Sequence, residues 1–538
     1  MRRALLLCAM IVALFGVALA LHPATEPWIR VRSDVRLPAF SSSRMFDAVM
    51  ELDKLDVRAD ETVLELAPDE GDPEGVLVYS TSPAKAKPLP STTLAAEELR
   101  GLAGLDVVSL AVDPRDWLHP EFGLKSNPLM RGRRWERGAC LSFFKGGELA
   151  LETPVGLRIH GDSSRLHFHK SYRVVMTPTY GTPRDAGRAF FAPPCGQILV
   201  LHADERGAKQ FFLNPIAYEL AASLGCMVPQ TRPVRVVING ELLQPIYFAT
   251  ERVSLDYLRS RYGHANFTAI DERNSRNPKR YLVELARLGT GHPVSMRQLG
   301  RTIDLEQVTG WIAMVLISGC FDFNQGLAFI DRSDPQPRWR WIVWDLDWSF
   351  QPWPVPWPAA QRHGTFTDYF MHHRRELRCD VFKRLMEDDP AYRRYFFERL
   401  AAAVNHEVSQ QRVRKLIDRY RDIARRYGGW RRDKMLASLD GVTQFLRGRP
   451  ARVLSELEQY YAIPNTSPVD VIVPAGATVT IDGRPYSRSY SGDYFQGHAI
   501  RVQTSDARAV WEINGERVQA DGALEWPIEE ATRIRLVR

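Results

Sequence analysis

Two acidic loops near the middle of the chain constrain its fold more than any other feature. A predicted helix ends near Asp322, and the strands predicted over 327–331 and 338–343 form a β-hairpin that ends at Asp345 and Asp347. Carboxylates at i and i+2 of a strand point to the same side. Acidic groups gathered at helix and strand ends suit a hard divalent cation, and such a cation in turn suits phosphate. Phosphoryl transfer is therefore the first hypothesis.

Composition and charge place the chain among ordinary globular proteins. Its 538 residues are enough for two to four domains, and it is 45% hydrophobic and 25% charged. The net charge of +7 is a mild excess at this length, although basic clusters occur at 131–135 and 425–432. These clusters indicate a solvated face or contact with an anionic membrane surface or acidic polymer. No recognition motif accompanies them, so we do not expect nucleic-acid binding.

The N-terminus is predicted to direct export. Arg2 and Arg3 precede an uncharged apolar run over 4–21 that ends in a small-residue cleavage signal, so residues 1–21 form a signal peptide or an uncleaved anchor. We expect the body of the protein in the periplasm, in the cell envelope or outside the cell, where ATP is scarce. Five cysteines lie beyond the apolar run, without a C-x-x-C pair. Most are expected to be buried small side chains, and their pairing is left open.

The sequence predicts four segments: a leader at 1–21, a β-rich or irregular region at 22–105, a central domain at 106–462, and a small β-sandwich-like or barrel-like module at 466–538. The last segment has short β-prone runs and hairpin signals at Asp482-Gly483. After Asp345 the central domain is predicted to contain only helices, from Phe366 to Tyr461, with Pro450 breaking the last one.

The first half of the central domain is predicted to be rich in strands. Strands are expected at 157–161 and 172–176, and Asn214-Pro215 opens a helix that Gly225 ends. Asn239-Gly240 predicts a type I′ hairpin whose second strand closes at Glu251. Asp304 is the predicted cap of the next helix, which has one apolar face. The chain thus reads as α+β, with a β-rich lobe and one embedded helix followed by a helical lobe, the order of a bilobal protein-kinase-like core.

The central domain resembles the CotH kinase-like family over about residues 107–462. The resemblance rests on the order and spacing of separated segments, which are 134–137, 158–165, 170–173, 214–225, 232–233, 239–240, 250–253, Asp322 and 344–347. It implies an atypical kinase that uses ATP with Mg²⁺ or Mn²⁺ to phosphorylate a Ser/Thr hydroxyl of a protein, or a glycan hydroxyl, in the cell envelope.

The resemblance also implies roles for individual residues. Asp322 would be the catalytic aspartate, and Asp345 would bind the metal. Lys170 would contact the α- and β-phosphates, with Glu219 as its paired carboxylate, and Glu251 would lie at the hinge beside adenine. The full predicted site is Asp322 as the catalytic residue, Lys170, Arg158, Ser163, Ser164, Glu219 and Glu251 at the nucleotide, and Asp345, Asp347 and Asn324 at the metal.

The loop after Asp322 departs from the family pattern. Leu327 stands where a kinase would place its asparagine ligand, so Asn324 or Gln325 would have to supply the oxygen. If neither does, the protein is a pseudokinase that acts as a cell-envelope binding or structural protein. A glycoside hydrolase with Asp322 and Asp345 as its carboxylate pair is a third alternative.

Several side chains admit two interpretations. Asp347 is either a metal ligand or a turn cap. His160, His167 and His169 suggest a metal site, but no further ligand completes it at familiar spacing, so solvent-facing or substrate-side histidines are expected. Four tryptophans near the hairpin are either a sugar-binding platform or core, and core packing is expected for the alternating pair; they are Trp339, Trp341, Trp344 and Trp348.

Overall fold

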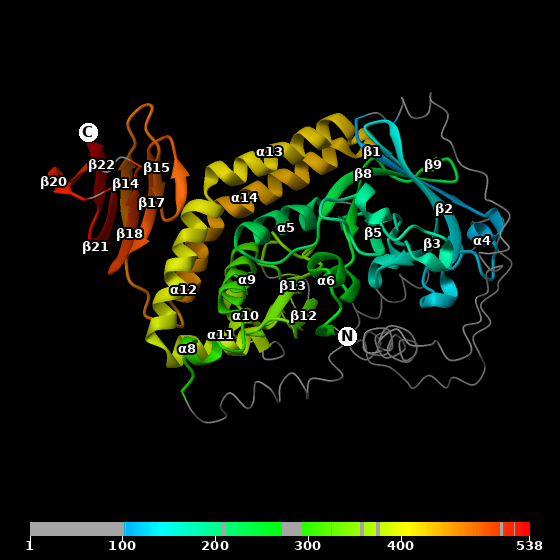
Figure 1. Ribbon diagram of the computed structural model, residues 1–538. Helices are drawn as coiled ribbons and strands as arrows, with labels where there is room; N and C mark the ends of the chain where they lie inside the picture. The colour runs from blue at the N-terminus through cyan, green and yellow to red at the C-terminus, as the bar shows by residue number, and fades with distance from the viewer. Residues whose placement is uncertain are drawn as a thin grey trace, which may run out of the picture. The chain divides into compact units, whose positions relative to one another are not determined.

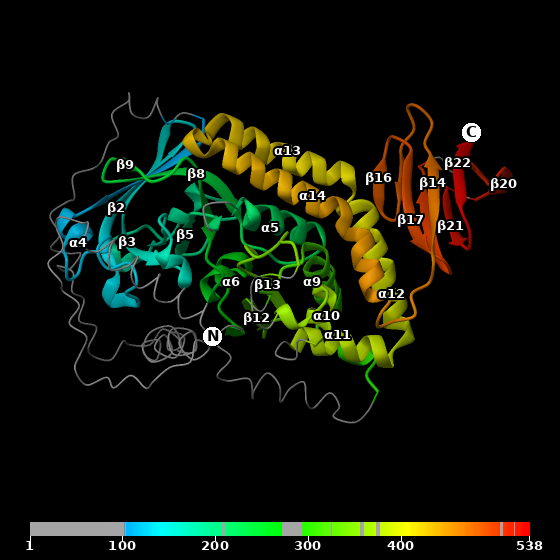
Figure 2. The same cartoon turned by 180° about the vertical axis from the view of Figure 1, so that it is seen from behind.

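The computed structural model describes residues 104–206, 210–271, 293–323, 325–353, 360–372, 377–505, 509–520 and 522–537, with Leu102 and Val355. The predicted leader, almost all of the 22–105 region, and Asn324 lie outside these residues. Within the described ranges, no helix combines the length and the apolar character needed to cross a membrane. The architecture is mixed α/β, with several sheets and a group of helices (Figures 1 and 2).

The largest sheet closes on itself. Its strand order is β1-β2-β3-β4-β5-β10-β8-β9, and β1 also pairs in parallel with β8. The strands are β1 (Asp106–Val112), β2 (Arg137–Lys145), β3 (Glu148–His160), β4 (Ser171–Val175), β5 (Ile198–His202), β8 (Thr231–Ile238), β9 (Glu241–Leu242) and β10 (Tyr247–Glu251). Alternate residues such as Leu157 and Ile159 fill an apolar core inside it. Their neighbours Arg158 and His160 therefore lie on the outer face.

The strand predictions for this sheet are confirmed. Asn239 and Gly240 have φ of 51° and 81°, the backbone that a type I′ turn requires. The second arm of that hairpin is interrupted, because β9 and β10 are separate strands that both pair with β8.

A second group of elements surrounds the acidic loops. Helix α5 (Leu213–Ser223) packs on α9 (Leu305–Ser318), and a three-stranded antiparallel sheet joins β11 (Phe267–Asp271), β12 (Gly326–Asp331) and β13 (Trp339–Val343). Asp304 caps α9 as predicted, since its side chain accepts from the Gln307 N–H. Almost every residue of α9 is buried, so the prediction of one apolar face was too narrow: other helices pack around it.

Helices follow the hairpin, as predicted. They are α10 (Phe366–His372), α11 (Leu377–Asp388), α12 (Pro390–Ala402), a π-helical turn (Ala403–Glu407), α13 (Gln410–Tyr427) and α14 (Arg432–Leu457). Helices α13 and α14 run side by side (Figures 1 and 2). The predicted break at Pro450 is wrong, because α14 continues through it. A proline inside a helix costs about 3 kcal/mol, and the complete burial of Val453 and Leu457 beyond it favours the continuous helix.

The C-terminal residues form two sheets that share one core, which includes Val469, Ile500 and Trp511. The strand orders are β17-β14-β22-β19-β20 and β16-β15-β18-β21. The bounds are β14 (Thr466–Ile472), β15 (Val479–Ile481), β16 (Arg484–Tyr486), β17 (Tyr490–Phe495), β18 (His498–Gln503), β19 (Val510–Ile513), β20 (Glu516–Gln519), β21 (Ala523–Ile528) and β22 (Thr532–Val537).

The remaining described elements are short. They are α4 (Pro114–Leu118), β6 (Glu205–Arg206), β7 (Gln210–Phe211), α6 (Leu255–Tyr262), α8 (Met296–Leu299) and several 3₁₀ turns, among them Ser163–Leu166 and Ala360–Arg362.

Candidate functional site

The loop that carries Asp322 is held by buried neighbours on both sides. Helix α9 ends at Gly319, whose φ is 61°, and Phe321 and Phe323 are buried in the main core. Asp322 between them is only partly buried. The Gln325 side chain donates from Nε2 to Asp322 Oδ2 at 2.7 Å, which fixes the carboxylate. Side chains buried on either side thus leave Asp322 as the partly exposed carboxylate of this loop.

Asp345 follows β13 in a left-handed backbone conformation, with φ of 58°. Two side chains of α5 clamp this turn: the Tyr218 hydroxyl accepts from the Asp345 N–H at 3.1 Å, and Asn214 Oδ1 accepts from the Leu346 N–H at 2.6 Å. Asn214 and Tyr218 are four residues apart, so they lie on one face of the helix. That face of α5 therefore sets the direction of the Asp345 carboxylate.

All three predicted carboxylates act electrostatically on one buried thiol, although among the described residues their oxygens do not form a group within 4.8 Å of one another. Burial raises the pKa of the Cys320 thiol well above its ordinary value, and the charges of Asp322, Asp347 and Asp345 raise it further. Burial also raises the pKa of Tyr218, with Asp345 and Asp347 adding to the effect. The pKa of one thiol is thus raised by the charges of all three carboxylates. Such a gathering of negative charge is stabilised by a divalent cation.

A basic cluster on the outer face of the closed sheet lies beside Trp344, the residue before Asp345. His160 Nδ1 is 3.4 Å from an Arg173 guanidinium nitrogen, and the Arg252 guanidinium lies 5.1 Å from the centre of the Trp344 ring. The His160 ring meets Trp344 edge-on at 6.2 Å. Burial, followed by the charges of Arg173 and Arg252, holds the pKa of His160 well below its ordinary value. Cationic side chains next to carboxylates suit a phosphate–metal pair.

The structure places the predicted nucleotide residues near this face but gives them other partners. Lys170 donates to the main-chain oxygen of His167, and burial lowers the pKa of its amine. Arg158 Nε lies 3.4 Å from a Glu136 carboxylate oxygen. Ser164 lies in the short turn that follows Gly161, and the side chain of Ser163 is outside the described residues.

The predicted pairing of Glu219 with Lys170 is wrong. Glu219 instead contacts Arg419 and accepts from the Tyr420 hydroxyl at 2.6 Å, because its face of α5 is turned to α13. Glu251 is also committed elsewhere. Its buried carboxylate pairs with Arg261 and accepts from the Gln230 N–H at 2.7 Å, and its main-chain N–H bonds Gln230 as well.

Other expectations meet mixed outcomes. Trp339 and Trp341 belong to the main core, so core packing is confirmed for this pair, and Trp344 packs in a smaller apolar cluster. His169 is buried, so a solvent-facing position is wrong for it, whereas His160 is partly buried. The five described cysteines form no disulfide, and all but Cys140 are buried, as expected for most of them. The buried four are Cys195, Cys226, Cys320 and Cys379.

The sequence analysis missed Asp204, Arg173 and Arg252. Burial raises the pKa of Asp204 to about 6, and this carboxylate also acts on Tyr218, which places it near Asp345. The signal for Asp204 was an acidic residue directly after an apolar strand. Arg173 and Arg252 lie inside segments that carry the resemblance, but no role was given to either, and only the pairing of β3, β4, β5 and β10 brings them to one face of the sheet.

Comparisons with known proteins identify the family of the chain. The family model described as CotH kinase protein matches residues 157–446, which is more than half of the chain. Among solved structures, the chain is similar to one titled "Crystal structure of A Helicobacter pylori proinflammatory kinase CtkA", with 10% identity, a TM-score of 0.24, and coverage of 59% of this chain and 91% of that chain. No curated protein matches. The family model covers β4, α5, α9 and both acidic loops, and the chain therefore belongs to the CotH kinase family.

Proposed function

We propose that this protein is an ATP-dependent phosphotransferase that modifies a Ser/Thr hydroxyl of a protein, or a glycan hydroxyl, in the cell envelope. The observation that carries the proposal is that Asp322, Asp345 and Asp347 of the two acidic loops all act on the Cys320 thiol, while Arg252 lies on the ring of Trp344, next to Asp345. Family membership supports this chemistry over glycoside hydrolysis. Export rests on the N-terminal sequence alone.

Each carboxylate takes a different part in the proposed reaction. Asp345 and Asp347 would hold Mg²⁺ or Mn²⁺, which neutralises the phosphate oxygens when bound. Asp322 accepts the proton of the acceptor hydroxyl as its oxygen attacks the γ-phosphate. Lys170 and Arg252 would stabilise the negative charge of the phosphates.

The donor set fits a hard cation. Gln325 Oε1 is buried and has no hydrogen-bond partner among the described residues, while its Nε2 is held by Asp322. A buried oxygen without a partner is costly, and a hard cation needs oxygen ligands. Gln325 is therefore a candidate to replace the missing asparagine ligand.

A specific observation favours the pseudokinase alternative. Leu327 is only 3% exposed and packs in an apolar cluster with Phe329 and Trp344. The position that supplies a second metal ligand in kinases is therefore part of the core. In this alternative the protein binds nucleotide or a partner without transferring phosphate.

Binding of an ATP analogue tests the assignment of the carboxylates. Asp345→Asn is expected to abolish metal-dependent nucleotide binding, whereas Asp322→Asn should keep it and lose phosphate transfer. Asp440→Asn, an exposed site on α14, is the matched control for the loss of one charge. Circular dichroism must first show that each variant is folded. Equal affinity of the wild type and Asp345→Asn for the ATP analogue would contradict the assignment of Asp345 as a metal ligand.

A further inference from the structure

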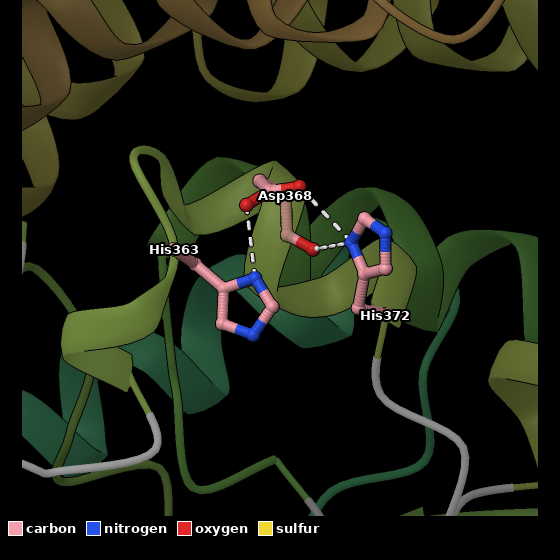
Figure 3. Close-up of side chains that lie close together, drawn as sticks. All are labelled: His363, Asp368 and His372. Atoms are coloured by element: carbon pink, nitrogen blue, oxygen red, sulfur yellow. Dashed lines mark hydrogen bonds and ion pairs between the residues drawn. The ribbon is translucent and has the colours of Figure 1, made fainter.

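Two histidines and an aspartate gather away from the three-carboxylate site. Asp368 and His372 are four residues apart on α10, so they share one face, and His363 precedes that helix. Figure 3 shows both imidazoles turned toward the Asp368 carboxylate. His363 Nδ1 lies 2.9 Å from Asp368 Oδ2, and His372 Nδ1 lies 3.0 Å from Asp368 Oδ1. One nitrogen of each ring and one carboxylate oxygen all lie within 4.8 Å of one another.

This set has the chemistry of a transition-metal site. Imidazole nitrogen and carboxylate oxygen bind Zn²⁺ at about 2.0–2.2 Å, and two histidines with one carboxylate leave an open position for water. Ligands of a tetrahedral ion at these bond lengths are separated by about 3.3 Å, close to the 2.9 Å and 3.0 Å between the imidazole nitrogens and the Asp368 oxygens. A hard oxygen-only cation such as Mg²⁺ does not favour imidazole, which separates this set from the three carboxylates.

Groups around the cluster hold its members in place. The Trp353 indole Nε1 donates to the main-chain oxygen of His363 at 3.0 Å. The Tyr460 hydroxyl, in the segment after α14, donates to Asp368 Oδ1 at 2.5 Å. His372 Nδ1 also lies 2.8 Å from the main-chain oxygen of Asp368, in a hydrogen bond that needs a proton on Nδ1 and that a metal ion on this nitrogen replaces. The Tyr460 bond orients the carboxylate of Asp368, and outer-shell bonds of this kind raise metal affinity.

We propose that His363, Asp368 and His372 bind one divalent transition-metal ion of the Zn²⁺ type, with water in the open position. The ion takes the Nδ1 lone pair of each imidazole, and each neutral ring then carries its proton on Nε2. His372 is 58% exposed at its side chain, which gives the ion a route from solvent.

The site has a structural consequence for the acidic loop. Tyr369, next to Asp368 on α10, lies 5.6 Å from the His363 ring, 6.1 Å from the Phe323 ring and 6.4 Å from the Phe321 ring. Phe321 and Phe323 flank Asp322. A metal that fixes His363 to α10 therefore stiffens the packing behind Asp322. This consequence, unlike metal binding itself, rests on the proposed function.

Metal titration of the full chain tests the site without any activity assay. The protein carries no histidine tag, is stripped with a chelator, and has Asp345→Asn so that the three-carboxylate site does not contribute. Co²⁺ is expected to give the visible absorption of a four-coordinate N/O site, and Zn²⁺ to displace it with one-to-one stoichiometry. Absence of both signals in this chain would overturn the proposal.

Three further variants locate the signal. In the same background, His372→Ala and Asp368→Asn are each expected to weaken Zn²⁺ binding by more than about tenfold, the loss that follows even from removal of an outer-shell partner. His264→Ala is the matched control, because His264 also faces a carboxylate, that of Asp331, at 3.4 Å. It is expected to bind as its parent does.

The metal-dependent rise in Tm gives a second readout. It should be lost in His372→Ala, which removes an exposed side chain and so leaves the fold intact, as circular dichroism without metal verifies. If His372→Ala binds Zn²⁺ with the affinity of its parent, the cluster is only a hydrogen-bonded triad. If His372→Ala loses Zn²⁺ binding and the wild type transfers no phosphate, the metal site is upheld and the proposed function is rejected.

Discussion

The hydroxyl of Tyr218 is expected to set the metal affinity of Asp345, and Tyr218→Phe tests this directly. Asp345 lies at φ of 58°, a left-handed conformation that costs about 1–2 kcal/mol for a residue with a side chain. The Tyr218 hydroxyl accepts from the Asp345 N–H at 3.1 Å in a partly buried hydrogen bond, although the tyrosine itself is buried. Without it, the N–H loses its partner, and a buried unpaired group costs about 1–3 kcal/mol.

In Tyr218→Phe the loop around Asp345 can relax to a conformation that avoids this cost. Metal binding must then restore the left-handed turn without the hydroxyl. We therefore expect the affinity for Mg²⁺ with an ATP analogue to fall by about five- to 150-fold, the equivalent of 1–3 kcal/mol. Isothermal titration measures the affinity, and urea unfolding measures the free energy of unfolding of the same samples.

Tyr257→Phe is the matched control for this experiment. Tyr257 is equally buried, and its hydroxyl donates to the main-chain oxygen of Val228 at 3.0 Å. Its loss should lower the free energy of unfolding without changing metal affinity. The reasoning is refuted if Tyr218→Phe binds metal as the wild type does, or if Tyr257→Phe loses as much affinity.

Three other substitutions have defined outcomes. Burial raises the pKa of Asp204 to about 6 from 3.8, so between these pH values the folded state keeps a proton that the unfolded state has lost. The free energy of unfolding should therefore fall by about 3 kcal/mol as the pH rises from about 4 to 6. Urea unfolding of Asp204→Asn should lack this fall. Arg449 and Glu456 form a buried ion pair; Arg449→Met should cost about 3–5 kcal/mol, and adding Glu456→Leu should recover most of the loss in urea unfolding. Gly161→Ala would place a Cβ 2.0 Å from Ser164 Oγ at φ of 108°; we expect a lower Tm and weaker nucleotide binding, and an unchanged affinity would remove this turn from the site.

Local signals predicted elements well where the physical cause is local. Asn239-Gly240 specifies its turn because both residues tolerate positive φ, and Asp304 caps α9 because its side chain reaches the Gln307 N–H. Pro450 shows the limit of such signals. The preference of proline is local, but burial of residues on both sides of it by other helices decides the conformation of α14.

The site shows the same division. Asp322 and Asp345 were predictable because each ends a regular element whose period is visible in the sequence. The partner of Glu219 was not, since a spacing along α5 does not say whether that face meets the sheet or α13. Arg252 reaches the face that meets Trp344 only because β10, which it follows, pairs with β5, itself next to β4 in the sheet. Long-range pairings of this kind leave no local periodicity.

Phosphate transfer from γ-labelled ATP tests the central claim most directly. The purified chain from His22 onward would be incubated with Mg²⁺ or Mn²⁺ and a generic acceptor protein, beside Asp322→Asn and the Asp440→Asn control. The account predicts label with the wild type and the control, and none with Asp322→Asn. Retained nucleotide binding with no label from the wild type, under either metal, would contradict phosphotransfer and favour the pseudokinase.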